Sequence, residues 1–441
     1  MIKQVIFALA LLVTMGIFAY TALRYVKLFK ITRPAFSLGN WAKRFSLTIE
    51  VAIAQSKMFR KPFTGILHAL VFWGFMVILV GSIEMVLDGL LNTERSLGML
   101  GVVHDVFMAS GDIFALIIIL ALVVFISRRV FLRVKRFEGE EMTQGSHIDA
   151  KIALALILIL MLTLLGLNSS YVAHQNATGQ TIVGSYPVSS IMASLYAGMS
   201  AKAIHVHHEF HWWAHILLIF FFANYLPYSK HFHVFMSVPN VFLSRLDPLG
   251  KLPNMDNITR EVKLMMNPET AFSAPEAEMI PERFGVKDAE DSSWKNFLDS
   301  LACTQCGRCT SVCPASITGK KLSPRKIIMD LRTRMNHKAE GLIKTGRHYD
   351  DGKSLIRDYI AEEELWACTT CNACAIECPI NINHPTLIVD MRRYLVMEEG
   401  SAPGELKAVF SNMENNGAPW QYSSEDRLNW ASNIEINNIK N

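Results

Sequence analysis

The chain has few charged side chains: Asp, Glu, Lys and Arg make up only 19% of its 441 residues, while hydrophobic residues make up 51%. Soluble domains usually carry about a quarter charged residues, so this deficit excludes an ordinary soluble protein and favours a membrane protein. The chain also has no cysteine outside the stretch from Cys303 to Cys378, where all eight lie. This clustering excludes a secreted disulfide scaffold and points to cofactor ligation.

A strong net charge is missing as well, the total being only +4. Residues 1–235 contain 19 Lys and Arg against 11 Asp and Glu, whereas residues 236–441 contain 24 against 28. Most cations of the first half lie in residues 24–61, in residues 128–151 and at Lys230. The positive-inside rule makes these segments cytoplasmic and places the N-terminus outside. Because membrane topology accounts for the excess of Lys and Arg in the first half, we expect no nucleic-acid partner.

Apolar runs long enough to cross about 30 Å of hydrocarbon occur five times. They cover residues 5–23, 62–83, 106–127, 152–172 and 210–229. The first is followed by Arg24, Lys27 and Lys30 in place of a small-residue cleavage site, so we expect a retained helix. We predict an all-α membrane protein with five transmembrane helices in residues 1–238. It would reside in a bacterial-type inner membrane, with lipid around the helices.

The remaining residues are predicted to form three segments on the cytoplasmic side. Residues 239–291 contain recurring prolines without a sustained period, which is typical of a tether. A soluble domain covers residues 292–400, and Ser292 and Ser293 are candidate helix caps at its start. Residues 401–441 form a C-terminal tail that we expect to contact a partner.

The eight cysteines form two runs with the same internal spacing, C-x-x-C-x-x-C-x-x-x-C-P. This spacing is specific to bacterial-type ferredoxins, in which the fourth cysteine of each run ligates the other cluster. We therefore predict a helical ferredoxin domain with two 4Fe–4S clusters. The ligands of one, the Cys303 set, are Cys303, Cys306, Cys309 and Cys378. The ligands of the other, the Cys368 set, are Cys368, Cys371, Cys374 and Cys313.

Other uses of the cysteines fit less well. Zinc sites commonly pair two C-x-x-C elements and need no further cysteine followed by proline, and a cytoplasmic location disfavours disulfides. Two clusters would use all eight thiols, so none remains for nucleophilic catalysis, and we expect any catalytic site on another chain. Within the runs, Gly307 allows a tight backbone path, and Asn372 at the equivalent place tolerates a left-handed conformation next best.

Ionisable residues within apolar spans are functional candidates. His215 and His233 are 18 residues apart, which in one continuous helix puts them on one face about 27 Å apart. His68 lies near the cytoplasmic end of the second span, at the depth expected for His233. Two histidines at matched depth on facing helices suit bis-imidazole haem, so we predict His68 and His233 as ligands of an inner b haem. The alternative is a buried histidine satisfied by a hydrogen bond.

A second, outer haem has a less obvious pair of ligands. His215 would supply one, but the position ten residues after His68, where its partner would face the same way, is Ile78. The best substitute is His104, at the outer start of the third span. The sequence thus predicts one b haem and leaves a second, held by His215 and His104, open.

The membrane half resembles the cytochrome b (gamma) subunit of respiratory nitrate reductase and the related membrane subunit of heterodisulfide reductase. The resemblance lies in the five spans, in His68 and in the stretch Leu-Pro-Tyr-Ser-Lys-His-Phe-His at residues 226–233. It implies b haem ligation and electron exchange with quinone. Ile78 departs from this pattern and leaves the outer haem in question.

The cysteine domain resembles the iron–sulfur subunit of heterodisulfide reductase at residues 303–309 and 366–371. The two halves and the tail, at residues 412–420 and 427–430, look like the N-terminal part of electron-transfer-flavoprotein:menaquinone oxidoreductases. Those proteins continue into a catalytic domain with C-C-G motifs, which this sequence does not contain.

These observations predict a membrane-bound respiratory electron-transfer subunit. It would pass electrons between membrane quinone, b-type haem, two 4Fe–4S clusters and a cytoplasmic partner. The partner would be a C-C-G-domain reductase or dehydrogenase subunit, or an electron-transfer flavoprotein. The alternative is a non-enzymatic membrane anchor or redox-sensing iron–sulfur scaffold. The direction of electron flow is not encoded, although the resemblance slightly favours flow from the partner to quinone.

Overall fold

Long helices dominate the first 230 residues. The computed structural model describes residues 2–132, 134–267 and 283–434, and within these ranges it is mostly helical, without a strand. Four helices are long and apolar enough to cross a membrane. They are α1 (Ile2–Ile31), α3 (Pro62–Leu91), α4 (Val102–Val130) and α5 (Gln144–Thr178). The all-α prediction is therefore confirmed for the described residues, and so is the presence of membrane-capable helices.

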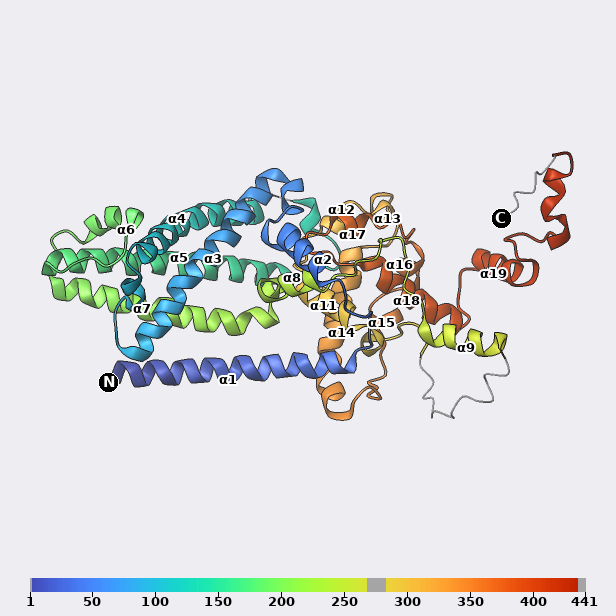
Figure 1. The fold of residues 1–441 in the computed structure, drawn as a ribbon, viewed down its shortest axis with the longest axis horizontal. Coiled ribbons are helices and arrows are strands. Elements are labelled where there is room, and N and C mark those ends of the chain that lie inside the picture. The colour runs from blue at the N-terminus through green and yellow to red at the C-terminus, as the bar shows by residue number, and fades with distance from the viewer. Residues whose placement is uncertain (1, 133, 268–282, 435–441) are drawn as a thin grey trace. The chain divides into compact units, whose positions relative to one another are not determined.

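The fifth expected span corresponds to α7 (Ala201–Tyr225), which packs along α5 (Figure 1). Its five histidines lower its hydropathy below that of the other four helices. It nevertheless shares a buried core with three of them, formed by Phe7 of α1, Met85 of α3, Leu167 of α5 and Ile216 of α7 itself. Ser200 caps its start by accepting a hydrogen bond from the Ala203 N–H.

The expectation that His215 and His233 share one continuous helix is wrong. Helix α7 ends at Tyr225, short 3₁₀ turns follow at Leu226–Tyr228 and Lys230–Phe232, and His233 begins α8 (His233–Phe242). Pro227 explains the break, because proline has no N–H to donate to the preceding turn. The two histidines therefore lie on different helices.

Short elements connect the long helices. They are α2 (Trp41–Thr48), a π-helical turn at Ile49–Ile53, α6 (Pro187–Met192), and 3₁₀ turns at Met58–Arg60, Ser96–Leu100, Lys135–Phe137 and Ala193–Tyr196.

The cysteine-containing part is built from short helices around a longer one. Helix α11 (Trp294–Ala302) is capped by Ser293, as the sequence predicts, and it packs on α14 (Pro324–Thr345). Phe297 and Leu301 of α11 and Leu331 of α14 are fully buried. The other helices are α12 (Arg308–Ser311), α13 (Pro314–Ile317), α15 (Leu355–Asp358), α16 (Glu362–Trp366), α17 (Ala373–Glu377) and α18 (His384–Met397).

The chain divides into two compact units. The first joins Met1–Asn254 to Asp288–Ile388, so the membrane half and the cysteine runs belong to one unit. The second joins Met255–Lys287 to Val389–Asn441 and contains α9 (Asp256–Met266), the end of α18, α19 (Gly404–Asn416) and a 3₁₀ stretch at Ser424–Ala431. Inside the second unit, the Val286 N–H donates to the Asp390 carbonyl at 3.0 Å. Part of the expected tether is thus helical, while its residues 268–282 lie outside the described residues.

Candidate metal centres

The two cysteine runs adopt the same backbone conformation. Gly307 and Asn372 both have left-handed φ angles, +73° and +62°, which confirms the expectation for these positions. Two residues earlier, Gln305 and Thr370 are left-handed as well, at +58° and +53°. The Gln305 N–H donates to the Cys303 Sγ at 3.5 Å, and the Thr370 N–H donates to the Cys368 Sγ at 3.4 Å. Both loops therefore curl around their first thiol and direct N–H groups at sulfur, which suits thiolate ligands.

A steric constraint, besides the φ angle, also favours glycine at position 307. A Cβ built there would lie 2.3 Å from the Arg136 carbonyl oxygen, far inside a normal contact. Arg136 belongs to the basic loop between α4 and α5, so the first cysteine run packs directly against the membrane half.

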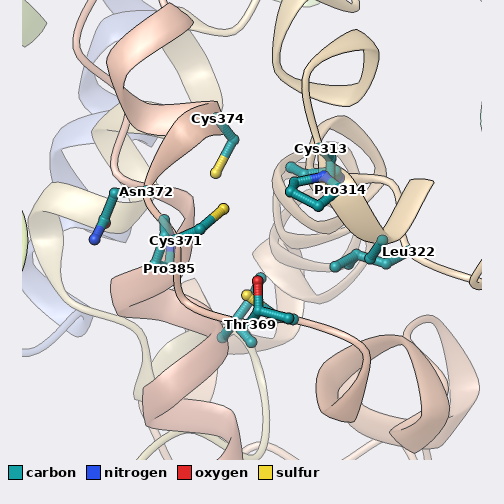
Figure 2. A pocket seen from close by; sticks show the side chains of 12 residues that line it. Cys313, Pro314, Leu322, Thr369, Cys371, Asn372, Cys374 and Pro385 are labelled. Carbon is teal, nitrogen blue, oxygen red and sulfur yellow. The ribbon is translucent and has the colours of Figure 1, made fainter. Parts of the chain in front are cut away.

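The four thiols of the Cys368 set line one cavity (Figure 2). In this view the side chains of Cys371 and Cys374 point into the space that faces Cys313. Burial raises the pKa of Cys374 to about 12, and the nearby thiols of Cys368 and Cys313 add to the rise. The structure thus brings together cysteines that are more than 50 residues apart. Cys371 is exposed, so this set reaches the surface.

The Cys303 set is more deeply placed. Cys303, Cys309 and Cys378 are buried, and Cys306 is intermediate. Burial raises the pKa of Cys378 to about 12, with contributions from the neighbouring thiols of Cys306 and Cys303. Burial also raises the pKa of Cys309, with Cys306 and Cys303 again contributing. The fourth cysteine of the second run therefore lies among the first three of the first run.

The cysteine arrangement suits a cluster better than a single ion. None of the eight cysteines is in a disulfide. Within the described part of the chain, no three His, Cys, Asp or Glu side chains gather closely enough to hold one metal ion. A single tetrahedral zinc needs such a gathering, with Zn–S bonds of about 2.3 Å. A cubane instead places its four irons, and therefore its four thiolates, at separate corners.

Three cations lie near the Cys303 set, and their side chains donate to neutral groups; Arg308 and Lys230 are buried, whereas Lys57 is half-buried. Arg308 is 3% exposed and donates to the carbonyls of Lys57 and Met58, at 3.0 and 3.4 Å. The Lys57 ammonium donates to the Asn381 side chain at 2.5 Å and the Cys378 carbonyl at 3.4 Å.

The third cation, Lys230, is 5% exposed and donates to Ser146 and to Gln305, the latter at 3.1 Å. Burial lowers the pKa of Lys230 to about 8, although Asp149 opposes the shift. Among the described ion pairs, none involves Lys57, Lys230 or Arg308. Buried cations ordinarily have a counter-charge, and a thiolate-ligated cluster is anionic.

His68 and His233 face each other at the end of the membrane half that contacts the cysteine loops. Their ring centroids are 6.5 Å apart, with 36° between the ring planes. Two imidazoles joined to one iron through bonds of about 2 Å would have centroids roughly 6 Å apart. The His68 Nδ1 is 2.9 Å from the Gln55 Oε1, and this contact orients the ring so that Nε2 remains for a metal. The residues present therefore fit a bis-histidine haem.

His104 and His215 are not brought together as a comparable pair. The His104 Nε2 is 3.0 Å from the Glu84 Oε1, and the His215 Nδ1 is 2.9 Å from the Thr163 Oγ1. No ring contact between these two histidines occurs in the described residues. Ile78 is buried in an apolar cluster with side chains of α4 and α5.

Sequence reasoning missed the residues that support the sites. Gln55 and Lys57 lie in connecting segments, where spacing gives no signal, and Arg308 begins the short helix α12. Arg308 could have been noticed because it directly precedes Cys309 in a ligand loop. The contact between Glu84 and His104 joins two different helices, and no periodic pattern predicts such a contact.

Comparison with known proteins identifies the cysteine domain. Residues 302–382 match the family model of the 4Fe-4S dicluster domain, which confirms the prediction of 4Fe–4S clusters in this chain. The chain is 30% identical over 96% of its length to the "probable iron-sulfur-binding oxidoreductase FadF" of Bacillus subtilis (strain 168). It is 29% identical over 88% of its length to the "EtfAB:quinone oxidoreductase" of Syntrophomonas wolfei subsp. wolfei. No solved structure matches.

A third relative is the "probable membrane-anchored ferredoxin" of Chromohalobacter salexigens, 36% identical over 38% of this chain and 27% of its own. Subunits of heterodisulfide reductases from Methanosarcina species are also similar. The chain spans 61% and 54% of the FadF and EtfAB:quinone oxidoreductase sequences. The resemblance to iron–sulfur electron-transfer oxidoreductases is therefore confirmed, and the chain is a membrane-type iron–sulfur protein similar to their subunits.

Proposed function

We propose that the chain is a membrane-bound respiratory electron-transfer subunit that links membrane quinone to a cytoplasmic partner through a b haem and two 4Fe–4S clusters. The observation that carries the proposal is the facing pair His68 and His233, at the end of the bundle that packs against the cysteine loops. When bound, the haem and the clusters would each accept and release one electron at a time.

The residues of this chain would hold and orient those groups. His68 and His233 would ligate the haem iron, with Gln55 fixing the His68 ring. The Cys303 set and the Cys368 set would each ligate one cluster. Arg308 connects the two regions, because it precedes Cys309 and donates to the carbonyls of Lys57 and Met58, just ahead of α3. The Cys303 set would thus be the one next to the haem.

We propose a single haem. His104 and His215 do not form a facing pair, and the His104 Nε2 already contacts the Glu84 Oε1, so a second haem held by Nε2 of His104 would require that contact to break. The outer polar residues would then be structural: the Glu84 carboxylate accepts from the Leu97 N–H at 2.9 Å besides contacting His104.

The proposed topology has five spans with the N-terminus outside and the cysteine domain in the cytoplasm. Helix α7 would be the fifth span, because it shares its core with α1, α3 and α5. The basic loops favour a cytoplasmic domain, since Arg136 and Glu141 of one loop and Lys57 of the other contact it. The proposed domains are residues 1–238, the tether 239–291, the cluster domain 292–400 and the tail 401–441.

Electron exchange with a partner would take place at the Cys368 set, whose Cys371 is exposed. The tail would contribute to partner contact, because its described part exposes Trp420, Tyr422 and Trp430. The partner would be a C-C-G-domain reductase or dehydrogenase subunit, as the sequence resemblance implies, or an electron-transfer flavoprotein. The name of the relative EtfAB:quinone oxidoreductase supports the second class, with quinone as the membrane substrate.

Spectra of the purified protein test the haem. Reduced-minus-oxidised spectra should show a b-type band in the wild type and in His104→Ala, and none in His68→Ala. An absent band in the wild type would contradict the haem, and a band that persists in His68→Ala would contradict its ligand. Non-haem iron should approach about eight atoms per chain.

Quinol addition separates this proposal from a redox-sensing scaffold or a simple membrane anchor. Electron transfer requires that a quinol analogue reduce the haem, or that reduced clusters be oxidised by quinone. A scaffold requires neither, so redox inertness toward both quinone and quinol with full cofactor content would favour it. Co-purification with a C-C-G-domain protein or a flavoprotein would identify the partner class.

A further inference from the structure

The two cysteine sets have opposite electrostatic surroundings. The cavity of the Cys368 set is lined, apart from its cysteines, by Pro, Ala, Leu, Ile, Thr and Asn residues, and none of its twelve lining residues is charged. The Cys303 set lies among cations: Arg308 precedes Cys309, and the Lys57 ammonium is 3.4 Å from the Cys378 carbonyl.

A third cation approaches the same set. Lys230 donates to the side chain of Gln305, between the first two cysteines of the run, at 3.1 Å. The side chains of Arg308, Lys57 and Lys230 thus donate to neutral oxygens. Carboxylates lie near two of them, because Asp149 acts on Lys230, and Glu377 and Glu50 act on Lys57. Arg308 is therefore the buried cation with the least compensation.

A positive charge near a cluster raises the reduction potential of that cluster. Reduction adds one negative charge, which nearby cations stabilise, and a buried cation is screened little by salt. Water at the exposed Cys371 also stabilises negative charge on the Cys368 set, but only from one side of that set. Arg308 and Lys230 are buried and therefore little screened by solvent, so we expect their effect to outweigh this contribution.

We propose that Arg308, Lys57 and Lys230 act as positioning residues that give the cluster held by the Cys303 set the higher reduction potential, and so direct electrons from the exposed set toward the membrane. The inference rests on the proposed function, and in particular on the two ligand sets. In this step one electron leaves the reduced cluster of the Cys368 set and reduces the oxidised cluster of the Cys303 set. No proton moves and no bond breaks. The partner is then the electron donor and quinone the acceptor.

The test is a potentiometric titration of the purified full-length protein, followed by electron paramagnetic resonance of the reduced clusters. The variants are Arg308→Gln and Lys57→Gln, which remove a charge, and Arg308→Lys, which keeps it. Lys344→Gln is the control, because Lys344 lies on α14 and pairs with Glu340 at the exposed surface. Iron and sulfide are counted in every sample first.

Removing one cation should shift the electron-sharing equilibrium between the clusters about tenfold, which equals about 59 mV for a one-electron couple. The higher of the two cluster potentials should fall in Arg308→Gln and in Lys57→Gln. It should recover in Arg308→Lys and stay unchanged in Lys344→Gln. The second charge-removing variant keeps the test decisive if Arg308→Gln does not fold.

Two results separate the inference from the function on which it rests. A wild-type protein with fewer than two clusters contradicts the proposed function and the ligand sets. If the wild type has both clusters, but the charge-removing variants shift only the lower cluster potential or neither potential, the result contradicts only the inference.

Discussion

The buried ion pair between Arg325 and Glu141 fixes the cluster domain to the membrane half, and its removal has a calculable cost. Arg325 lies in the first turn of α14 and its side chain is 1% exposed, while Glu141 belongs to the loop between α4 and α5 and is 5% exposed. The closest N–O distance is 2.7 Å. Arg325 also donates to the carbonyls of Arg136 and Glu138, at 2.6 and 2.7 Å.

The change Arg325→Met keeps most of the side-chain volume and leaves the Glu141 carboxylate buried without its cation. Breaking a buried pair in this way costs about 3–5 kcal/mol. Ser323 still donates to the carboxylate at 2.6 Å, so we expect a loss near the lower end, about 3 kcal/mol. The second change Glu141→Gln removes the orphaned charge, and the double variant should therefore regain part of the loss.

Urea unfolding of the purified protein, followed by loss of cluster absorbance, measures the effect. With a slope of about 1–3 kcal/mol per M, the midpoint in Arg325→Met should fall by about 1–3 M. Lys344→Met is the matched control, because it breaks an exposed pair on the same helix and should leave the midpoint unchanged. The reasoning is refuted if Arg325→Met unfolds at the same urea concentration as this control. It is equally refuted if adding Glu141→Gln lowers the midpoint further.

Three further outcomes are expected. Gly307→Ala should destabilise the cluster domain by about 2 kcal/mol or more in the same urea assay, because it adds a left-handed strain and a clash with the Arg136 carbonyl, whereas Asn372→Gly should not. The hydrogen bond from Arg334 lowers the pKa of Asp351 from 3.8 to about 2, so its contribution is present above about pH 4 and is lost as the pH falls toward 2; Asp351→Asn should flatten this slope in thermal melts. Pyridine haemochrome assays should give one haem per chain, and the same value in His104→Gln; a lower value in that variant would contradict the single-haem proposal.

The elements and the cofactor class were predictable because they depend on local sequence. Apolar runs define α1, α3, α4 and α5, and Ser293 caps α11 where the sequence places a cap. The repeated cysteine spacing predicted the 4Fe–4S domain, because cluster ligation needs that pattern within one loop.

The geometry around the sites was less predictable. The spacing of His215 and His233 assumed an unbroken helix, and the chain breaks at Pro227 instead, yet His233 faces His68 all the same. The approach of Arg136 to Gly307 is a contact between segments 171 residues apart, and only the fold determines it. The left-handed φ of Gly307 was visible in the sequence, whereas the reason that no other residue fits there was not.

The packing of the cysteine loops on the membrane half also determines which electron-transfer step depends on the concentration of a second molecule. Because both belong to one chain and one compact unit, electron transfer between His68/His233 and the thiols would need no diffusional encounter, and dilution would not slow it. Exchange at the exposed Cys371 would instead depend on a second molecule and on its concentration. At low partner concentration, encounter at that thiol would limit turnover, while the covalent arrangement keeps the internal step at a fixed rate.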